Sequence, residues 1–187
     1  MKEPSPFYSV KPGLGIQLDI RYATPNNFTG AVLPGYHRPA AWLIPRCGQI
    51  FEDAQQYLLS LGYGVVVWDA YRPRRATLAM LEWARRTDQW QLVTEGYIAE
   101  RSRHNSAAAI DLGLFSIASG QLVDMGSEWD CFEQISHTFS ATGEVLEHRL
   151  VLRNAMLLAG WSAFDVEWWH FELEGAAELP VFDTPYA

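Results

Sequence analysis

The sequence predicts a single α+β domain in which a mainly antiparallel sheet is flanked by helices. Helical patterns and hairpin-linked strand patterns follow one another in runs rather than in strict βαβ alternation. A length of 187 residues suits one domain, and 49 % hydrophobic against 19 % charged residues is an ordinary globular balance. We therefore treat 1–187 as one domain with a core from about residue 12 to residue 180.

The first periodic pattern predicts a helix over 49–60, and a strand over 63–68 follows it. The apolar residues of this helix recur at i, i+4, i+7 and i+8, namely Ile50, Ala54, Tyr57 and Leu58. Gly62 is well placed to end the helix. The strand contains three consecutive valines, and such an apolar β-branched run is typical of a strand covered on both faces.

The middle of the chain predicts one helix and one hairpin. Residues 74–86 follow a turn that ends in Pro73 and carry an apolar side, which favours a helix. Residues 107–115 and 121–125 read as two strands joined by a turn at Gly120.

The last third predicts a helix over 144–159 and a closing strand over 166–173. Leucines line one face of the helix, and Gly160 stands just beyond its end. The strand is rich in aromatic residues, which suit a half-buried pleated surface.

The charge balance narrows the class of partner. The net charge is −8, from 22 acidic and 14 basic residues, and no Lys/Arg cluster is present that could neutralise a phosphate backbone. No apolar run reaches the roughly 18 residues that a membrane helix needs, and no signal-peptide pattern stands at the start. We expect a cytoplasmic protein that binds neither nucleic acid nor membrane, and homo-oligomerisation stays open.

Two histidines and one aspartate match the ligand set of a catalytic zinc ion. Such an ion takes three protein ligands and leaves its fourth position to water. His104, Asp111 and His170 supply two imidazoles and a carboxylate. A carboxylate between apolar residues of a strand is expensive to bury unless it is paired or bound to metal, which favours Asp111 as a ligand. A structural role in the core is the alternative for His170.

Glu167 is the candidate general base beside this metal. On a regular strand Glu167 and His170, three residues apart, would point to opposite faces, so a bulge or a strand end is required between them. A glutamate next to zinc-activated water could take its proton and later pass it to the leaving amine.

Arg72 follows the predicted buried strand directly. A guanidinium at that place could bind the oxyanion of a tetrahedral intermediate or clamp a carboxylate. The alternative is an ion pair with Asp69, three residues before it.

Taken in order, the motifs of this chain resemble those of the VanX-type D-alanyl-D-alanine dipeptidases, within the zinc D-Ala-D-Ala peptidases. The resemblance runs from about residue 18 to residue 172. It rests on Asp19-Ile20-Arg21-Tyr22-Ala23-Thr24 with Asn27-Phe28-Thr29-Gly30, Asp69-Ala70-Tyr71-Arg72-Pro73, Ser102-Arg103-His104 to Asp111, Asp124-Met125-Gly126-Ser127, and Glu167-Trp168-Trp169-His170-Phe171.

The resemblance implies a hedgehog/DD-peptidase-like fold and assigns roles to individual residues. It makes His104, Asp111 and His170 the ligands of one zinc ion per chain, and Glu167 the base. It implies that Arg72 stabilises the tetrahedral intermediate. It also implies that three further residues bind the substrate's ammonium group, namely Tyr22, Ser102 and Asp124.

One position departs from the family pattern, because Ala107 stands where the family usually has glycine. If that place requires a positive φ, alanine is strained there by roughly 1 kcal/mol or more.

The expected activity is hydrolysis of D-alanyl-D-alanine to two molecules of D-alanine, with water activated by zinc and Glu167. Such a substrate calls for a small, closed cavity. Two alternatives remain: a D,D- or L,D-carboxypeptidase that trims longer peptidoglycan stem peptides, and a zinc-binding module without activity.

Overall fold

A five-stranded sheet forms the centre of the fold in the computed structural model, which describes residues 7–186. Its strand order is β2-β4-β5-β7-β6. The β2–β4 pair is parallel and the other three pairs are antiparallel, so the predicted mainly antiparallel sheet is confirmed. The strands of this sheet are β2 (Ile16–Leu18), β4 (Tyr63–Asp69), β5 (Ala109–Ser116), β6 (Ser162–Ala163) and β7 (His170–Glu172). A separate antiparallel pair is made by β1 (Tyr8–Val10) and β3 (Ala41–Leu43).

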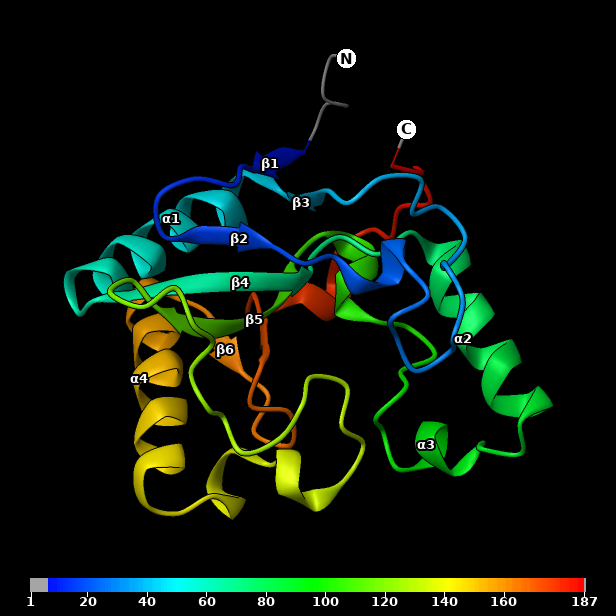
Figure 1. The fold of residues 1–187 in the computed structure, drawn as a ribbon. Coiled ribbons are helices and arrows are strands. Elements are labelled where there is room, and N and C mark those ends of the chain that lie inside the picture. Colours follow the sequence, from blue (N-terminus) through cyan, green and yellow to red (C-terminus); the bar gives the residue numbers. More distant parts are fainter. Residues whose placement is uncertain (1–6, 187) are drawn as a thin grey trace.

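The helices lie in two groups, one near each end of the central strand β4. Figure 1 shows α1 and α4 towards the end where β4 begins, and α2 and α3 towards the end where it finishes. The helices are α1 (Pro45–Ser60), α2 (Arg74–Arg86), α3 (Gln91–Thr94) and α4 (Gly143–Ala159), with short 3-10 turns η1 (Arg21–Ala23), η2 (Arg103–Ser106), η3 (Gln134–Ser136), η4 (Thr138–Ser140) and η5 (Ala176–Glu178). No helix within residues 7–186 has the length and apolar character needed to cross a bilayer.

The strongest patterns of the sequence match the structure closely. The predicted helix over 74–86 is α2 to the residue, and α4 ends before Gly160, which adopts φ 102° as its C-cap. The helix predicted over 49–60 begins four residues earlier, at Pro45. Proline is favoured at a first helical position because its missing N–H has no partner to lose there.

The strand predicted over 121–125 is too long. It is reduced to an antiparallel bridge between Leu122 and Phe115, with one backbone hydrogen bond to β5 on each side of it. Two residues later the Asp124 carboxylate accepts a hydrogen bond of 2.8 Å from the backbone N–H of Gly126. Such a side-chain bond to a nearby N–H favours a turn over a strand ladder.

The closing strand predicted over 166–173 is too long, because only β7 pairs with its neighbours. Residues 165–169 form turns, and the backbone N–H of His170 donates to the Glu167 carbonyl at 3.1 Å. The strand end that the spacing of Glu167 and His170 required is therefore present.

The core extends beyond the predicted limits of 12 and 180. Val10 in β1 is 2 % exposed and Tyr186 is fully buried. The Tyr186 hydroxyl donates to the Tyr71 carbonyl at 2.6 Å, and its backbone N–H donates to the Gly35 carbonyl at 2.8 Å. Both ends of the described chain pack onto Tyr71, just before α2, because the Phe7 ring is stacked on the Tyr71 ring with 5.0 Å between their centres.

Candidate metal centre and active site

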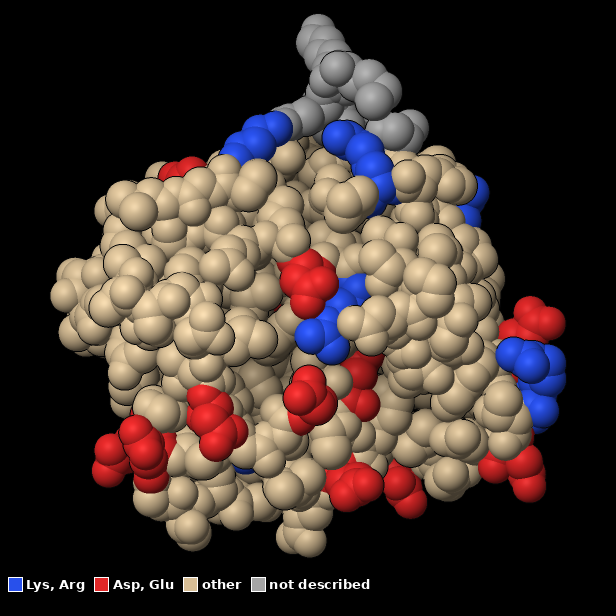
Figure 2. All heavy atoms as spheres, in the orientation of Figure 1, with Lys and Arg blue, Asp and Glu red and all other residues tan. Residues whose placement is uncertain are grey.

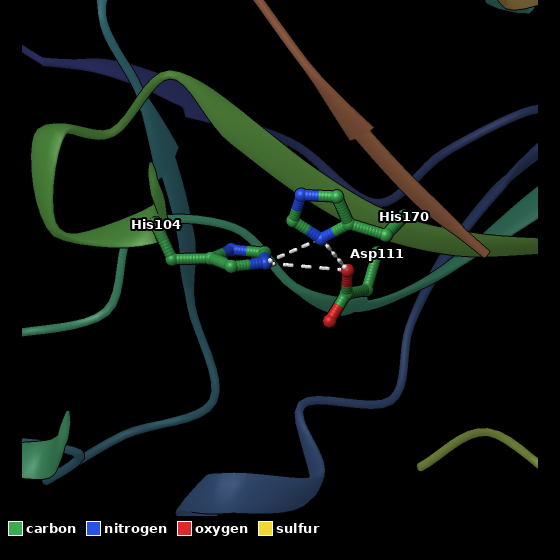
Figure 3. Close-up of side chains that lie close together, drawn as sticks. All are labelled: His104, Asp111 and His170. Atoms are coloured by element: carbon green, nitrogen blue, oxygen red, sulfur yellow. Dashed lines mark hydrogen bonds and ion pairs between the residues drawn. The ribbon is translucent and has the colours of Figure 1, made fainter. Parts of the chain in front are cut away.

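Strand register brings the candidate ligands together. Asp111 in β5 is paired with Asp69 in β4 on one side and with His170 in β7 on the other. Side chains at directly paired positions of neighbouring strands lie on the same face of a sheet. His104 belongs to η2, the turn that leads into β5, and Figure 3 shows it reaching toward the Asp111–His170 pair.

The three candidate ligand atoms form a nearly equilateral triangle. Nε2 of His104 lies 3.2 Å from both Nδ1 of His170 and Oδ1 of Asp111, and the last two atoms are 3.0 Å apart. Ligands about 2.0–2.1 Å from a tetrahedral zinc ion stand roughly 3.3 Å from one another. The geometry therefore fits one small divalent ion.

The chemistry of the donors fits a cation as well. Nδ1 of His104 faces the Ala70 carbonyl at 2.6 Å and must carry its proton there, which leaves a lone pair on Nε2. Nε2 of His170 faces a carboxylate oxygen of Glu172 at 3.4 Å, which favours the proton on that nitrogen and a lone pair on Nδ1. Two lone pairs and a carboxylate oxygen that converge repel one another unless a cation lies between them.

The close contacts in this cluster shift the pKa values of Asp111 and His170. Burial would raise the pKa of Asp111, but His104 and His170 beside it lower the pKa well below its usual range. Burial would lower the pKa of His170, yet hydrogen bonds with Asp111 and Glu172 outweigh it and raise the pKa to about 10. In the absence of metal, a proton thus takes the place of the cation.

Glu167 lies next to the ligands without being one of them. Its Oε2 atom is 4.0 Å from Nδ1 of His170, too far for a hydrogen bond. Burial raises the pKa of Glu167 to about 7, although the charges of His170 and Arg72 oppose the rise. A carboxyl group with that pKa can both accept and return a proton near neutral pH.

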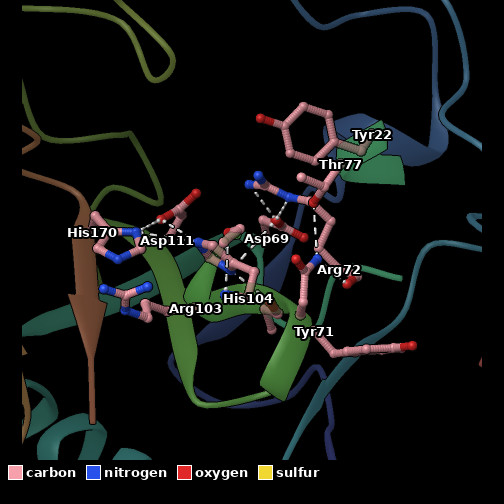
Figure 4. A network of polar contacts seen from close by, with 12 residues as sticks. Tyr22, Asp69, Tyr71, Arg72, Thr77, Arg103, His104, Asp111 and His170 are labelled. Carbon is pink, nitrogen blue, oxygen red and sulfur yellow. Dashed lines mark hydrogen bonds and ion pairs between the residues drawn. The ribbon is translucent and has the colours of Figure 1, made fainter. Parts of the chain in front are cut away.

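Arg72 is held rigidly at the other side of the cluster (Figure 4). Its Nε and Nη2 atoms bind one oxygen of the buried Asp69 at 3.0 and 2.9 Å. Its guanidinium carbon stands 4.9 Å from the centre of the Tyr22 ring. The predicted alternative of an ion pair with Asp69 is confirmed, and the pair leaves Arg72 lining the same cavity as the ligands.

A cavity of about 280 Å³ contains this constellation. Its volume is just below the roughly 300–1,000 Å³ that is usual for drug-sized ligands, as expected for a very small substrate. Of the predicted site residues, seven line it: His104, Asp111, His170, Glu167, Arg72, Tyr22 and Ser102. Ser102 is 7 % exposed, and its hydroxyl accepts the backbone N–H of His104 at 3.3 Å.

Asp124 is not brought to the site, so its predicted contact with the substrate's ammonium group is corrected. Its side chain lies on an exposed turn and does not line the cavity. Asp130 lines the cavity in its place and accepts a hydrogen bond of 2.7 Å from the Tyr22 hydroxyl. Burial raises the pKa of Asp130 well above its usual value.

Sequence reasoning missed three residues that support the site. Trp129 donates its indole N–H to Oδ2 of Asp111 at 3.2 Å and so orients the ligand oxygen. Neither Trp129 nor Asp130 carries a signal in the sequence, because both lie in an irregular loop. Glu172 could have been predicted from the sequence. It stands two residues after His170, and residues i and i+2 of a strand lie on the same face.

Comparisons with known proteins place the chain among peptidases. The family model Peptidase_M15, described as D-ala-D-ala dipeptidase, matches residues 2–187. A D-alanyl-D-alanine dipeptidase of Enterococcus faecalis is 33 % identical over 187 residues, covering 92 % of this chain and 89 % of the relative. Those of Streptomyces coelicolor and Escherichia coli are 31 % and 30 % identical, cover 92 % of this chain, and are themselves covered over 94 % and 86 % of their lengths.

Proposed function

The chain belongs to the D-Ala-D-Ala dipeptidase family of peptidases, and we propose on this premise that it cleaves D-alanyl-D-alanine into two molecules of D-alanine with one zinc ion. The observation that carries the proposal is the convergence of His104, Asp111 and His170, with the Glu167 carboxylate beside them, in one small cavity. A bound zinc ion would supply Lewis acidity, which makes water a nucleophile at neutral pH.

Glu167 acts as the proton carrier in this proposal. Its carboxylate takes a proton from the attacking water as the oxygen bonds to the scissile carbonyl carbon. The same proton then passes to the amide nitrogen as the C–N bond breaks, so that the amine leaves neutral. The pKa of about 7 that burial gives Glu167 suits both transfers.

Arg72 stabilises the negative charge that develops on the carbonyl oxygen. Its pairing with Asp69 fixes the guanidinium before the substrate binds, so that little reorganisation is needed during the reaction. Donors of this kind contribute roughly 10²–10³-fold to turnover in other hydrolases.

Asp130 and Tyr22 receive the substrate's ammonium group in this proposal, with Ser102 as a further polar contact in the cavity. An ammonium group beside Asp130 would favour its ionised form, against the effect of burial. A longer stem peptide presents an uncharged amide at that position. The Asp130 carboxylate therefore favours a dipeptide as substrate, which supports a dipeptidase over the alternative of a carboxypeptidase acting on longer peptides.

We also propose a cytoplasmic location. Cys47 and Cys131 are both free, as is usual in a reducing compartment.

Glu167→Gln tests the mechanism, because it keeps the shape of the side chain and removes the base. Turnover of D-Ala-D-Ala should fall by roughly 10²–10⁴-fold while one zinc ion per chain stays bound. Glu174→Gln, an exposed acid just after β7, is the matched control and should keep full activity. Near-normal D-alanine release by Glu167→Gln would remove Glu167 from the mechanism. If the parent protein and both variants release no D-alanine, the dipeptidase activity is excluded and the inactive zinc-binding module is favoured.

A further inference from the structure

We propose that Arg103 binds the free carboxylate of the dipeptide and thereby sets the requirement for an unblocked C-terminus. The inference rests on the proposed dipeptidase function and deepens it, because the groups discussed above account for the ammonium end and the scissile bond but not for the carboxylate. A dipeptide carries opposite charges at its two ends, and the second charge needs a cation in the cavity wall.

Three cationic side chains are found among the residues that line the cavity, namely Arg72, Arg101 and Arg103. Arg72 has two of its three nitrogens committed to Asp69 and stands over the Tyr22 ring, next to the acidic Asp130 end. Arg101 is exposed and gives one nitrogen to the Leu179 carbonyl at 3.1 Å. Arg103 is the remaining candidate.

Arg103 has unused donor capacity at a buried atom. Its Nη1 atom donates to the Arg101 carbonyl at 3.2 Å, but its Nε atom is shielded from solvent and makes no hydrogen bond within the described structure. The nearest acid is Glu172, with an oxygen 3.8 Å from that nitrogen, which is beyond hydrogen-bonding distance. The other oxygen of Glu172 faces His170, so the carboxylate is shared between two cations. A buried guanidinium N–H without an acceptor is uncommon in folded proteins and indicates a missing partner.

The position of Arg103 suits the carboxyl end of the substrate. Figure 4 shows Arg72 and Tyr22 on one side of the ligand cluster and Arg103 on another, beside His170. A dipeptide with its ammonium group at Asp130 and its carbonyl at the ligands would direct its carboxylate away from Asp130. The side chain of Arg103 is 37 % exposed, so it stands at the mouth of the cavity, where an incoming carboxylate can reach it.

The test compares D-Ala-D-Ala with its C-terminal amide, which lacks the charge, in the parent protein and in Arg103→Met. The parent protein should prefer the free acid by about 10–100-fold in kcat/KM, the range of one charge-assisted contact. Arg103→Met should lose that preference, through a rise in KM for the acid, while its rate on the amide stays unchanged. Arg103→Lys should keep part of the preference as a point charge.

Arg101→Met is the matched control, a cation two residues away that should keep the full preference for the acid. The zinc content of each variant shows whether His104 still binds the metal, and the midpoint of thermal unfolding shows whether the fold is intact. If Arg103→Met does not fold, Arg103→Gln is used in its place. The role of Arg103 would be overturned if Arg103→Met lost kcat/KM equally on the acid and the amide, or if it kept the full preference for the acid. The proposed dipeptidase activity of the parent protein would not be affected by either result. A parent protein that cleaves neither compound would overturn the proposed function and this inference with it.

Discussion

At the scale of single residues, the candidate site is a buried cluster that demands a positive charge. Asp111 and His170 are 2 % and 9 % exposed, and the cluster draws support from Trp129 on one side and Glu172 on the other. Without metal, the raised pKa of His170 means that a proton supplies this charge. In the proposed metal site, a proton and the metal ion would therefore compete for Nδ1 of His170.

Zinc binding at pH 7.5 should release about one proton per ion. The pKa of about 10 places His170 in its protonated form at that pH, and the metal requires the neutral imidazole. The apparent zinc affinity should accordingly rise about tenfold per pH unit until the pH approaches that pKa. Calorimetry in buffers of different ionisation enthalpy measures the released proton, and a value near zero would contradict the protonated His170.

Ala107 occupies a backbone conformation that glycine adopts more easily. It has φ 57° and ψ 26° at the end of η2, so the position does require the positive φ that the family glycine suggested. Replacement by glycine relieves about 1–2 kcal/mol of strain but loses roughly 0.8 kcal/mol for the buried methyl group and a further 0.4–1 kcal/mol through the more flexible unfolded chain.

These opposing effects predict that Ala107→Gly changes the free energy of unfolding by less than about 1 kcal/mol and leaves zinc binding unchanged. Ala107→Val should destabilise the protein far more, because a β-branched residue tolerates positive φ poorly. Urea denaturation of the three proteins checks both expectations. A stabilisation by glycine well above 1 kcal/mol would show that the ligand turn is more strained than its φ indicates.

At the scale of elements, long periodic segments were predictable and short irregular ones were not. The helix over 74–86 has enough turns for its apolar side to be recognised, and the valine run of β4 is typical of a buried strand. The segments 121–125 and 166–169 have strand-like composition, but a local turn ends the pairing after residue 123 in the first and turns replace it in the second. Asp130 could not be predicted for the same reason, since its place depends on how the loop 125–137 folds.

Arg149 in α4 fixes that loop. It is 1 % exposed, and its guanidinium donates to the carbonyls of Met125, Ile135 and His137 at 2.7–2.9 Å. Because these carbonyls come before and after Trp129 and Asp130, Arg149 supports both the candidate ligand Asp111 and the proposed ammonium site.

Arg149→Met should lower the free energy of unfolding by roughly 3–5 kcal/mol, because three backbone carbonyls, that of Met125 buried, lose a charged donor. Arg153→Met, one turn further along α4, removes a partly exposed pair with Asp165 and a contact with the exposed Phe139 ring, and should cost about 1–2 kcal/mol. Urea denaturation of the two variants gives both values. Equal destabilisation would show that Arg149 does not hold the loop.

At the scale of the whole molecule, residues from distant parts of the chain build one cavity, from Tyr22 near the beginning to His170 near the end. That His104, Asp111, His170 and Glu167 lie in one cavity was predictable, because their chemical types stand in ordered motifs. The tail was not, since nothing in its composition shows that Tyr186 would be buried against the segment before Arg72. In Figure 2, most acidic groups on the face in view lie over its lower part, whereas basic groups lie at its top, its centre and its right edge.

The central claim is that one divalent ion, held by His104, Asp111 and His170, is required for cleavage of D-Ala-D-Ala. The most direct test measures zinc content and D-alanine release on the same samples, during stepwise removal of metal by a chelator and stepwise return of zinc. We expect one zinc ion per chain and a rate that falls and recovers in proportion to the bound metal. D-alanine release by the metal-free protein at the rate of the loaded protein would contradict it.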